Sequence, residues 1–123
     1  MNKPLISVIT INYNGLIHTM DFLASFQKIT YPNVEVIVVD NASKESPDNL
    51  LEKYPDTILV KNPVNEGFAG GNNRGMEIAK GDYFFLINND TEVAPDILEA
   101  LLERAENSEK VGLVCPKILY HEK

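Results

Sequence analysis

The chain has 123 residues, enough for one compact domain with a hydrophobic core, so we expect a single domain over residues 1–123. Its 18 acidic and 11 basic side chains give a net charge of -7. Such a charge repels the phosphate backbone of nucleic acids, so we expect no nucleic-acid partner. We see neither an apolar run of roughly 20 residues that could cross a bilayer nor a secretory leader, so we expect a cytoplasmic protein.

The first part of the chain alternates between patterns typical of strands and of helices. Residues 5–11 are β-branched and apolar on both faces, which predicts a strand that is covered on both sides. Apolar residues then recur at helical spacing from Leu16 onward, and residues 31–33 end that segment. The pattern of residues 34–40 predicts a second buried strand.

The middle of the chain continues this alternation. Ser46 and Pro47 suit the cap and the first turn of a helix, which we predict to run to about Tyr54. Residues 57–61 are predicted to form a short third strand. Residues 62–75 are rich in glycine and asparagine, which predicts a loop that leads into a helix ending near Lys80.

The last part of the chain contains two further predicted strands and one helix. We expect residues 83–88 to form a buried fourth strand and residues 110–116 to form a fifth, with Cys115 as a small buried side chain. Between them, Pro95 opens a helix whose apolar residues fall on one face: Ile97, Leu98, Leu101, Leu102 and Ala105. The whole order predicts an α/β fold, a three-layer sandwich in which helices cover both faces of a mostly parallel sheet.

Polar segments follow each of the first four predicted strands. In parallel α/β sheets, ligands bind outside the carboxyl ends of the strands, so these segments predict a ligand site. They are "NYNG", "DNAS", the glycine- and asparagine-rich loop, and "NNDTE". No G-x-S-x-G, G-x-x-x-x-G-K-[ST] or G-x-G-x-x-G motif is present, which argues against acyl transfer and against Walker-type and dinucleotide sites.

Three side chains in these segments have chemistry that suits a nucleotide. Asp90 can hold a divalent cation while the phosphates of the ligand complete its coordination, or it can simply form a turn. Asp40 can accept a hydrogen bond from a base, or it can cap the turn that follows its strand. The ring of Tyr13 can stack on a base or pack against the neighbouring loop.

Four stretches together resemble the successive signatures of family 2 glycosyltransferases, inverting enzymes of GT-A fold, and most closely their rhamnosyltransferase-like branch. The stretches are "ISVITINYNG", "VEVIVVDNAS", "NEGFAGGNNRG" and "GDYFFLINNDTEVAPDILEALLE". They cover essentially the whole chain in the right order. The resemblance implies that the chain is the N-terminal half of a GT-A, Rossmann-like fold, which binds a nucleotide-diphosphate sugar.

The resemblance implies a role for each of the strand ends on the nucleoside side. Ile11, Asn12 and Tyr13 would cradle the nucleoside. Asp40 would hydrogen-bond the base, with Asn41 beside it.

On the diphosphate side, the resemblance places Asn73 and Arg74 nearest the nucleotide. Asn88, Asn89 and Asp90 would occupy the place of the family's D-x-D motif, with Asp90 binding Mn²⁺ or Mg²⁺. The first position of that motif is an amide in this chain, so the cation would depend on one carboxylate and on the diphosphate. Many family members also have an arginine where this chain has Asn72.

The reaction implied is a displacement, with inversion, of a UDP-, dTDP- or GDP-linked sugar by a hydroxyl of a saccharide or lipid-linked acceptor, as in polysaccharide biosynthesis. In the family, the general base and the acceptor site lie downstream of the D-x-D region. We therefore expect residues 1–123 to be a donor-binding part, truncated at the C-terminus and unable to transfer the sugar alone. An exposed sheet edge in such a part would favour a homodimer.

Two other functions fit the alternation of strands and helices less well. A receiver-like signalling domain needs an acidic pair after the first strand, where this chain has Asn12, Tyr13 and Asn14, and its Lys117 follows Pro116 instead of preceding a proline. A sugar-phosphate nucleotidyltransferase needs a basic, glycine-rich loop at the same place, and "NYNGLIHT" contains one glycine and no lysine or arginine.

Overall fold

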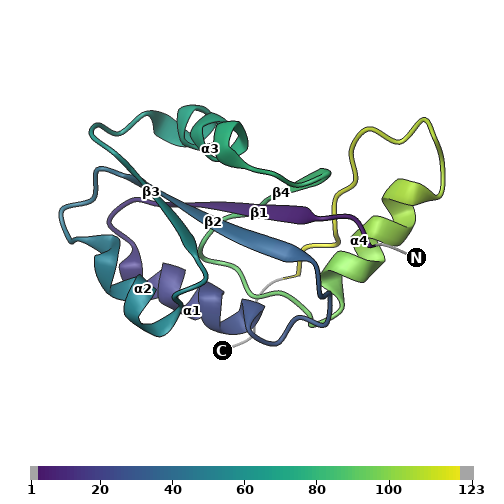
Figure 1. Ribbon diagram of the computed structural model, residues 1–123, viewed down its shortest axis with the longest axis horizontal. Coiled ribbons are helices and arrows are strands. Elements are labelled where there is room, and N and C mark those ends of the chain that lie inside the picture. The colour runs from purple at the N-terminus through teal and green to yellow at the C-terminus, as the bar shows by residue number, and fades with distance from the viewer. Residues whose placement is uncertain (1–2, 120–123) are drawn as a thin grey trace.

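The computed structural model describes residues 3–119 and contains, in that range, one parallel sheet between two layers of helices (Figure 1). The sheet has the strand order β3-β2-β1-β4, with bounds Ile6–Asn12 (β1), Val34–Asn41 (β2), Ile58–Asn62 (β3) and Tyr83–Leu86 (β4). The helices are Leu16–Phe26 (α1), Pro47–Asn49 (the 3₁₀ turn η1), Leu50–Lys53 (α2), Gly67–Ile78 (α3) and Ile97–Glu106 (α4). The predicted three-layer α/β sandwich is confirmed.

Helices cover both faces of the sheet, as Figure 1 shows, with α3 on one face and α1 and α2 on the other. Alternate side chains of β1 accordingly enter two different cores. Ile6 and Val8 pack with Phe22 of α1, and Ile9 packs with Met76 of α3. Within residues 3–119, no helix combines the length and the apolar character that crossing a bilayer requires.

The register of the central strands places their polar ends side by side. Asn12 of β1 lies opposite Asp40 of β2, and Asn41 of β2 lies opposite Asn62 of β3. Because these strands are parallel, their last residues and the segments that follow them share one end of the sheet, which we call the carboxyl end. The predicted gathering of polar strand ends is confirmed.

The glycine-rich stretch that we predicted as a loop over residues 62–75 is mostly helical, and this prediction was wrong. Helix α3 begins at Gly67 and includes four of these glycines. The glycines disfavour a helix by about 1 kcal/mol each relative to alanine, but they let its backbone lie close to the sheet. A Cβ on Gly71 would lie 2.8 Å from Ile11 Cδ1, and one on Gly75 would lie 2.5 Å from Ile9 Cγ2. Packing against the sheet therefore decides the conformation of this stretch.

The predicted fourth strand is shorter and more exposed than we expected. It ends at Leu86 instead of residue 88, and as an edge strand it leaves Tyr83, Phe84 and Leu86 at least 36% exposed. The expectation of a buried strand was wrong because β4 pairs only with β1 within the described range. Its outer edge is free there.

The predicted fifth strand over residues 110–116 is also wrong, because this described segment has no regular secondary structure. Its β-branched composition suits a strand, but a strand also needs a hydrogen-bonding neighbour, and the segment pairs with none within residues 3–119. Leu113 is 91% exposed, and Cys115, which we expected to be buried, is exposed as well.

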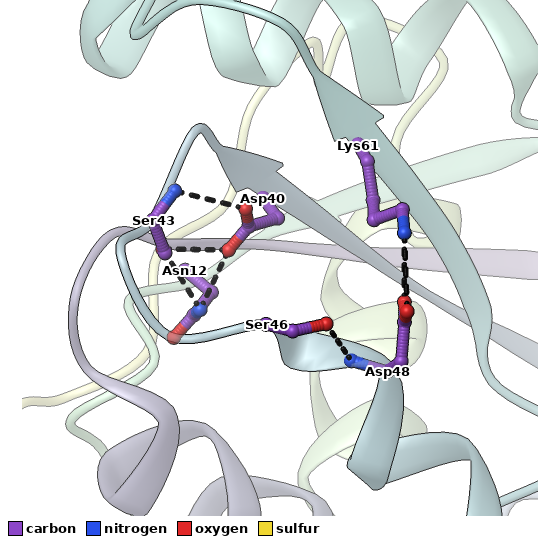
Figure 2. A network of polar contacts seen from close by, with 6 residues as sticks. All are labelled: Asn12, Asp40, Ser43, Ser46, Asp48 and Lys61. Carbon is purple, nitrogen blue, oxygen red and sulfur yellow. Dashed lines mark hydrogen bonds and ion pairs between the residues drawn. The ribbon is translucent and has the colours of Figure 1, made fainter.

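The helix predicted after Ser46 is confirmed, although its first turn is the 3₁₀ turn η1. Ser46 Oγ accepts a hydrogen bond from the Asp48 backbone N–H at 3.3 Å, as expected of a cap. The Asp48 carboxylate also forms an ion pair with Lys61 Nζ at 2.9 Å, which joins η1 to β3 (Figure 2). The hydrogen bond from Lys61 lowers the pKa of Asp48 below its ordinary value.

Replacing Gly75 by alanine tests the close approach of α3 to the sheet. The added methyl group would press on the buried, stiff side chain of Ile9, and we expect this overpacking to exceed the gain in helix propensity. The free energy of unfolding, measured with urea, should fall by about 1–2 kcal/mol. Gly112→Ala is the control, because its Cβ would meet no atom within 4 Å. A Gly75→Ala variant as stable as the control would contradict the close packing.

Candidate functional site

The carboxyl end of the sheet holds a group of buried polar side chains. Asn12, Asp40, Asn41 and Asn62 are each at most 4% exposed, although all four lie in the last two residues of their strands. Buried polar groups are unfavourable unless they are hydrogen-bonded. Two networks of hydrogen bonds satisfy these side chains, and each network joins segments that are far apart in the sequence.

The first network is centred on the Asp40 carboxylate (Figure 2). Asn12 Nδ2 donates to Asp40 Oδ1 at 2.8 Å, and Ser43 donates to the same oxygen from its hydroxyl at 2.6 Å. The Ser43 backbone N–H donates to Asp40 Oδ2 at 3.1 Å. These bonds support the turn after β2, where Ala42 has a φ of 60°, in the left-handed region that alanine rarely adopts.

The same network continues into α1 and into the segment after β4. Thr19 donates from its hydroxyl to Asn12 Oδ1 at 2.7 Å. Asn89 donates from Nδ2 to the Thr19 hydroxyl oxygen at 2.9 Å and, more weakly, to the Gly15 carbonyl at 3.5 Å. The predicted D-x-D-like segment is thereby attached to the ends of β1 and β2.

The second network joins β2 and β3 to the start of α3. Asn62 Nδ2 donates to Asn41 Oδ1 at 2.8 Å, and Asn41 Nδ2 donates to the Gly67 carbonyl at 3.0 Å. Arg74 Nε donates to Asn62 Oδ1 at 3.3 Å, and Arg74 also forms an ion pair with Glu77 at 3.4 Å. The guanidinium that we predicted to lie near the nucleotide thus contacts β3 and its own helix.

The remaining predicted site residues lie around these networks, most of them exposed. Tyr13 is 52% exposed and its ring is accessible. Asn73, Asn88 and Asp90 are exposed, whereas Ile11 is half-buried beneath Gly71 of α3. The structure therefore joins Asn12, Asp40 and Asn89 in one network and Asn41 and Arg74 in the other, and it leaves the other predicted residues outside both.

Sequence reasoning missed Thr19, Ser43 and Asn62, which hold the predicted residues in place. The available signal for Thr19 was a hydroxyl among the apolar residues of one helix face. The signal for Ser43 was its place three residues after Asp40, the spacing at which serine and aspartate support a turn. Nothing local marks Asn62, because its partners come from β2 and α3.

The fit of a divalent cation depends on Asp90. Among the described residues, no three His, Cys, Asp or Glu side chains lie together as a metal site would need. Mg²⁺ is commonly held by one or two carboxylates together with the phosphates of a substrate, and an exposed carboxylate flanked by amides suits that mode. Asp90, preceded by Asn88 and Asn89, fits a cation that arrives with a diphosphate and does not fit a cation held by the protein alone.

The fold matches that of glycosyltransferases of GT-A fold. A mannosyltransferase from Pyrobaculum calidifontis, solved in complex with GDP-Man and Mn²⁺, superimposes with a TM-score of 0.82 at 26% identity, over 91% of this chain and 35% of that one. S. aureus TarS, solved as residues 1–349 in complex with UDP-GlcNAc, has the same fold, with a TM-score of 0.73 at 24% identity, over 82% of this chain and 32% of that one.

Sequence comparison gives the family. The model of glycosyl transferase family 2 matches residues 7–123, and the chain belongs to this family. An uncharacterized glycosyltransferase of Haemophilus influenzae is 34% identical over 106 residues, and the teichuronic acid biosynthesis glycosyltransferase TuaG of Bacillus subtilis, itself described as putative in function, is 32% identical over 105 residues. The matches cover 83% and 82% of this chain, which spans 42% of the length of each relative.

The second network predicts different consequences for Asn41, which belongs to it, and for Asn73, which lies outside it. Asn41→Ala removes the partner of Asn62 and of the Gly67 carbonyl, so the free energy of unfolding should fall by about 1–3 kcal/mol. Asn73→Ala changes an exposed helical side chain and should alter the free energy of unfolding by less than about 0.5 kcal/mol. Urea unfolding of both variants measures the difference, and equal stabilities would show that Asn41 is not structural.

Proposed function

We propose that this chain binds the nucleoside diphosphate part of a sugar donor at the carboxyl end of the sheet, as part of a glycosyltransferase. The observation that carries the proposal is the first network, which brings together the ends of β1 and β2, helix α1 and the segment after β4 in a member of family 2. In a parallel α/β sheet, this is the place where ligands bind.

The nucleoside would lie against Tyr13 and Asp40, flanked by Ile11, Asn12 and Asn41. The exposed ring of Tyr13 supports stacking on a base. A carboxylate can accept about four hydrogen bonds, and within residues 3–119 Asp40 Oδ2 accepts a single one, from the Ser43 N–H. Asp40 therefore keeps the capacity to accept a further bond from a base N–H while its other oxygen holds the turn.

The diphosphate and a divalent cation, Mn²⁺ or Mg²⁺, would lie at Asn88, Asn89 and Asp90. When bound, such a cation supplies a Lewis acid that stabilises the charge of the leaving nucleoside diphosphate. The Mn²⁺ bound to the Pyrobaculum calidifontis mannosyltransferase supports this choice. Asn73 and Arg74 would approach the ligand from α3 if Arg74 released Asn62.

For the full-length protein, we propose transfer of a hexosyl or deoxyhexosyl group with inversion to a hydroxyl of a saccharide or lipid-linked acceptor, in the cytoplasm. The rhamnosyltransferase-like signatures and the teichuronic acid role named for TuaG support a place in polysaccharide biosynthesis. Because the chain spans 42% of that relative, we propose that the general base lies outside residues 1–123 and that this chain alone binds the donor without transferring the sugar.

Calorimetric titration of UDP, GDP and dTDP, each with and without Mn²⁺, tests the donor site. We expect one of the three to bind, and to bind more tightly when Mn²⁺ is present. In Asp90→Asn, the gain from Mn²⁺ should disappear while binding without metal persists, because the substitution removes the carboxylate and leaves the fold unchanged.

Asp56→Asn is the matched control for that titration. It removes an exposed carboxylate just before β3, at the opposite end of the sheet, and should leave the gain from Mn²⁺ unchanged. A folded wild-type chain that bound none of the three nucleotides in either condition would refute the donor site.

We also propose that the free edge of β4 pairs with a second copy of the chain, forming a homodimer. The edge carries the half-exposed apolar side chains of Tyr83, Phe84 and Leu86, which favour strand addition. Phe84→Lys should shift the chain toward the monomer in sedimentation velocity, because a charged edge strand resists pairing. Ile17→Lys, at a 77% exposed position on α1, should not. A wild-type chain that stayed monomeric at high concentration would exclude the dimer.

A further inference from the structure

Thr19 carries a hydroxyl group on the helix face that otherwise buries apolar side chains. It is fully buried on α1, on the face that also buries Phe22, Leu23 and Phe26. A hydroxyl in such a core is unfavourable unless it is hydrogen-bonded, and a valine of the same shape would avoid the penalty. The contacts of Thr19 therefore need an explanation beyond packing.

Both partners of Thr19 belong to the candidate site. Its oxygen accepts from Asn89 Nδ2 at 2.9 Å, and its proton is donated to Asn12 Oδ1 at 2.7 Å. Asn12 in turn donates to Asp40 at 2.8 Å. Four side chains thus form one chain of hydrogen bonds, Asn89 to Thr19 to Asn12 to Asp40, across three strand ends and a helix.

The direction of this chain is set by its last member. The Asp40 carboxylate only accepts, so Asn12 must turn its amide nitrogen toward Asp40 and its oxygen toward Thr19. The Thr19 proton then points at Asn12, and the free side of its oxygen faces Asn89. Only one orientation of each donor satisfies every hydrogen bond in this chain. Asn89 is therefore held in one orientation.

Asn89 is the link to the cation. It is half-buried, while its neighbours Asn88 and Asp90 are exposed. Within residues 3–119, the Asn89 side chain donates to the Thr19 hydroxyl and, more weakly, to the Gly15 carbonyl at 3.5 Å. Holding the Asn89 side chain restrains the backbone on both sides of it. This restraint sets the direction of the neighbouring Asp90 side chain.

We propose that Thr19 is a positioning residue, which couples the nucleoside end of the site at Asp40 to the diphosphate end at Asp90. This inference rests on the proposed donor site. Without the Thr19 hydroxyl, Asp40 keeps its bonds from Asn12 and Ser43, while Asn89 loses its main partner. Asn12 Oδ1 also loses the Thr19 donor, but Asn12 keeps its bond to Asp40, so the larger loss falls on the cation and diphosphate.

The test compares Thr19→Val with Thr19→Ser by calorimetric titration of the nucleoside diphosphate that the wild-type chain binds, with and without Mn²⁺. Thr19→Val should reduce the gain from Mn²⁺ about five- to tenfold, the value of one neutral hydrogen bond, and leave metal-free affinity within about twofold. Thr19→Ser keeps the hydroxyl and should keep the gain. A general loss of structure would lower both affinities together.

Thr10→Val is the matched control. Thr10 is as fully buried as Thr19, but its hydroxyl has no hydrogen-bond partner within the described residues. The same substitution there should leave both affinities unchanged. An equal loss in Thr10→Val and Thr19→Val would overturn the positioning role.

Asn89→Ala breaks the same link from the other side and disturbs the core less. If the two residues act through their shared bond, Thr19→Val combined with Asn89→Ala should lose no more of the Mn²⁺ gain than Asn89→Ala alone. Additive losses would overturn the inference, as would an unchanged Mn²⁺ gain in Thr19→Val. A wild-type chain that binds no nucleotide would refute the donor site itself, and the positioning role with it.

Discussion

The hydrogen bond from Asn12 to Asp40 joins the carboxyl ends of the two central strands, and the first network of the candidate site depends on it. It fixes the orientation of the Asn12 amide, which determines where the Thr19 proton points and hence how Asn89 is held. On the other side, the same carboxylate supports the turn that contains Ala42 in its left-handed conformation. A side chain buried at this point whose oxygens accept from Asn12 and Ser43 organises polar side chains from three strand ends.

The second network has a different basis, the close approach of α3 to the sheet. Glycine at positions 71 and 75 leaves no side chain between the helix and β1, so the helix start comes within reach of Asn41. The position of Arg74 follows from this, since its guanidinium lies beside Asn62. The site is thus built on two supports, a carboxylate between β1 and β2 and a glycine face of α3.

Much of the fold could be predicted because buried parallel strands and amphipathic helices have strong periodic patterns. The exposed or unpaired elements could not be predicted. Residues 83–88 and 110–116 have the composition of buried strands, but their exposure and pairing depend on which neighbours are present in space. The prediction of a loop in the α3 stretch failed in the opposite way. The weak helix propensity of this stretch is overcome by packing that no local pattern reveals.

The sequence by itself determined the order of the first four strands and their helices, and the polar segments that follow these strands, which include Asp90. Only the tertiary structure decided which of these residues are free and which are engaged. Asn41 and Arg74 hold the fold together, Tyr13 and Asp90 remain exposed, and Thr19 links Asn12 to Asn89. The reason is physical: a hydrogen bond between residues 70 positions apart depends on how strands and helices pack, and local composition does not predict it.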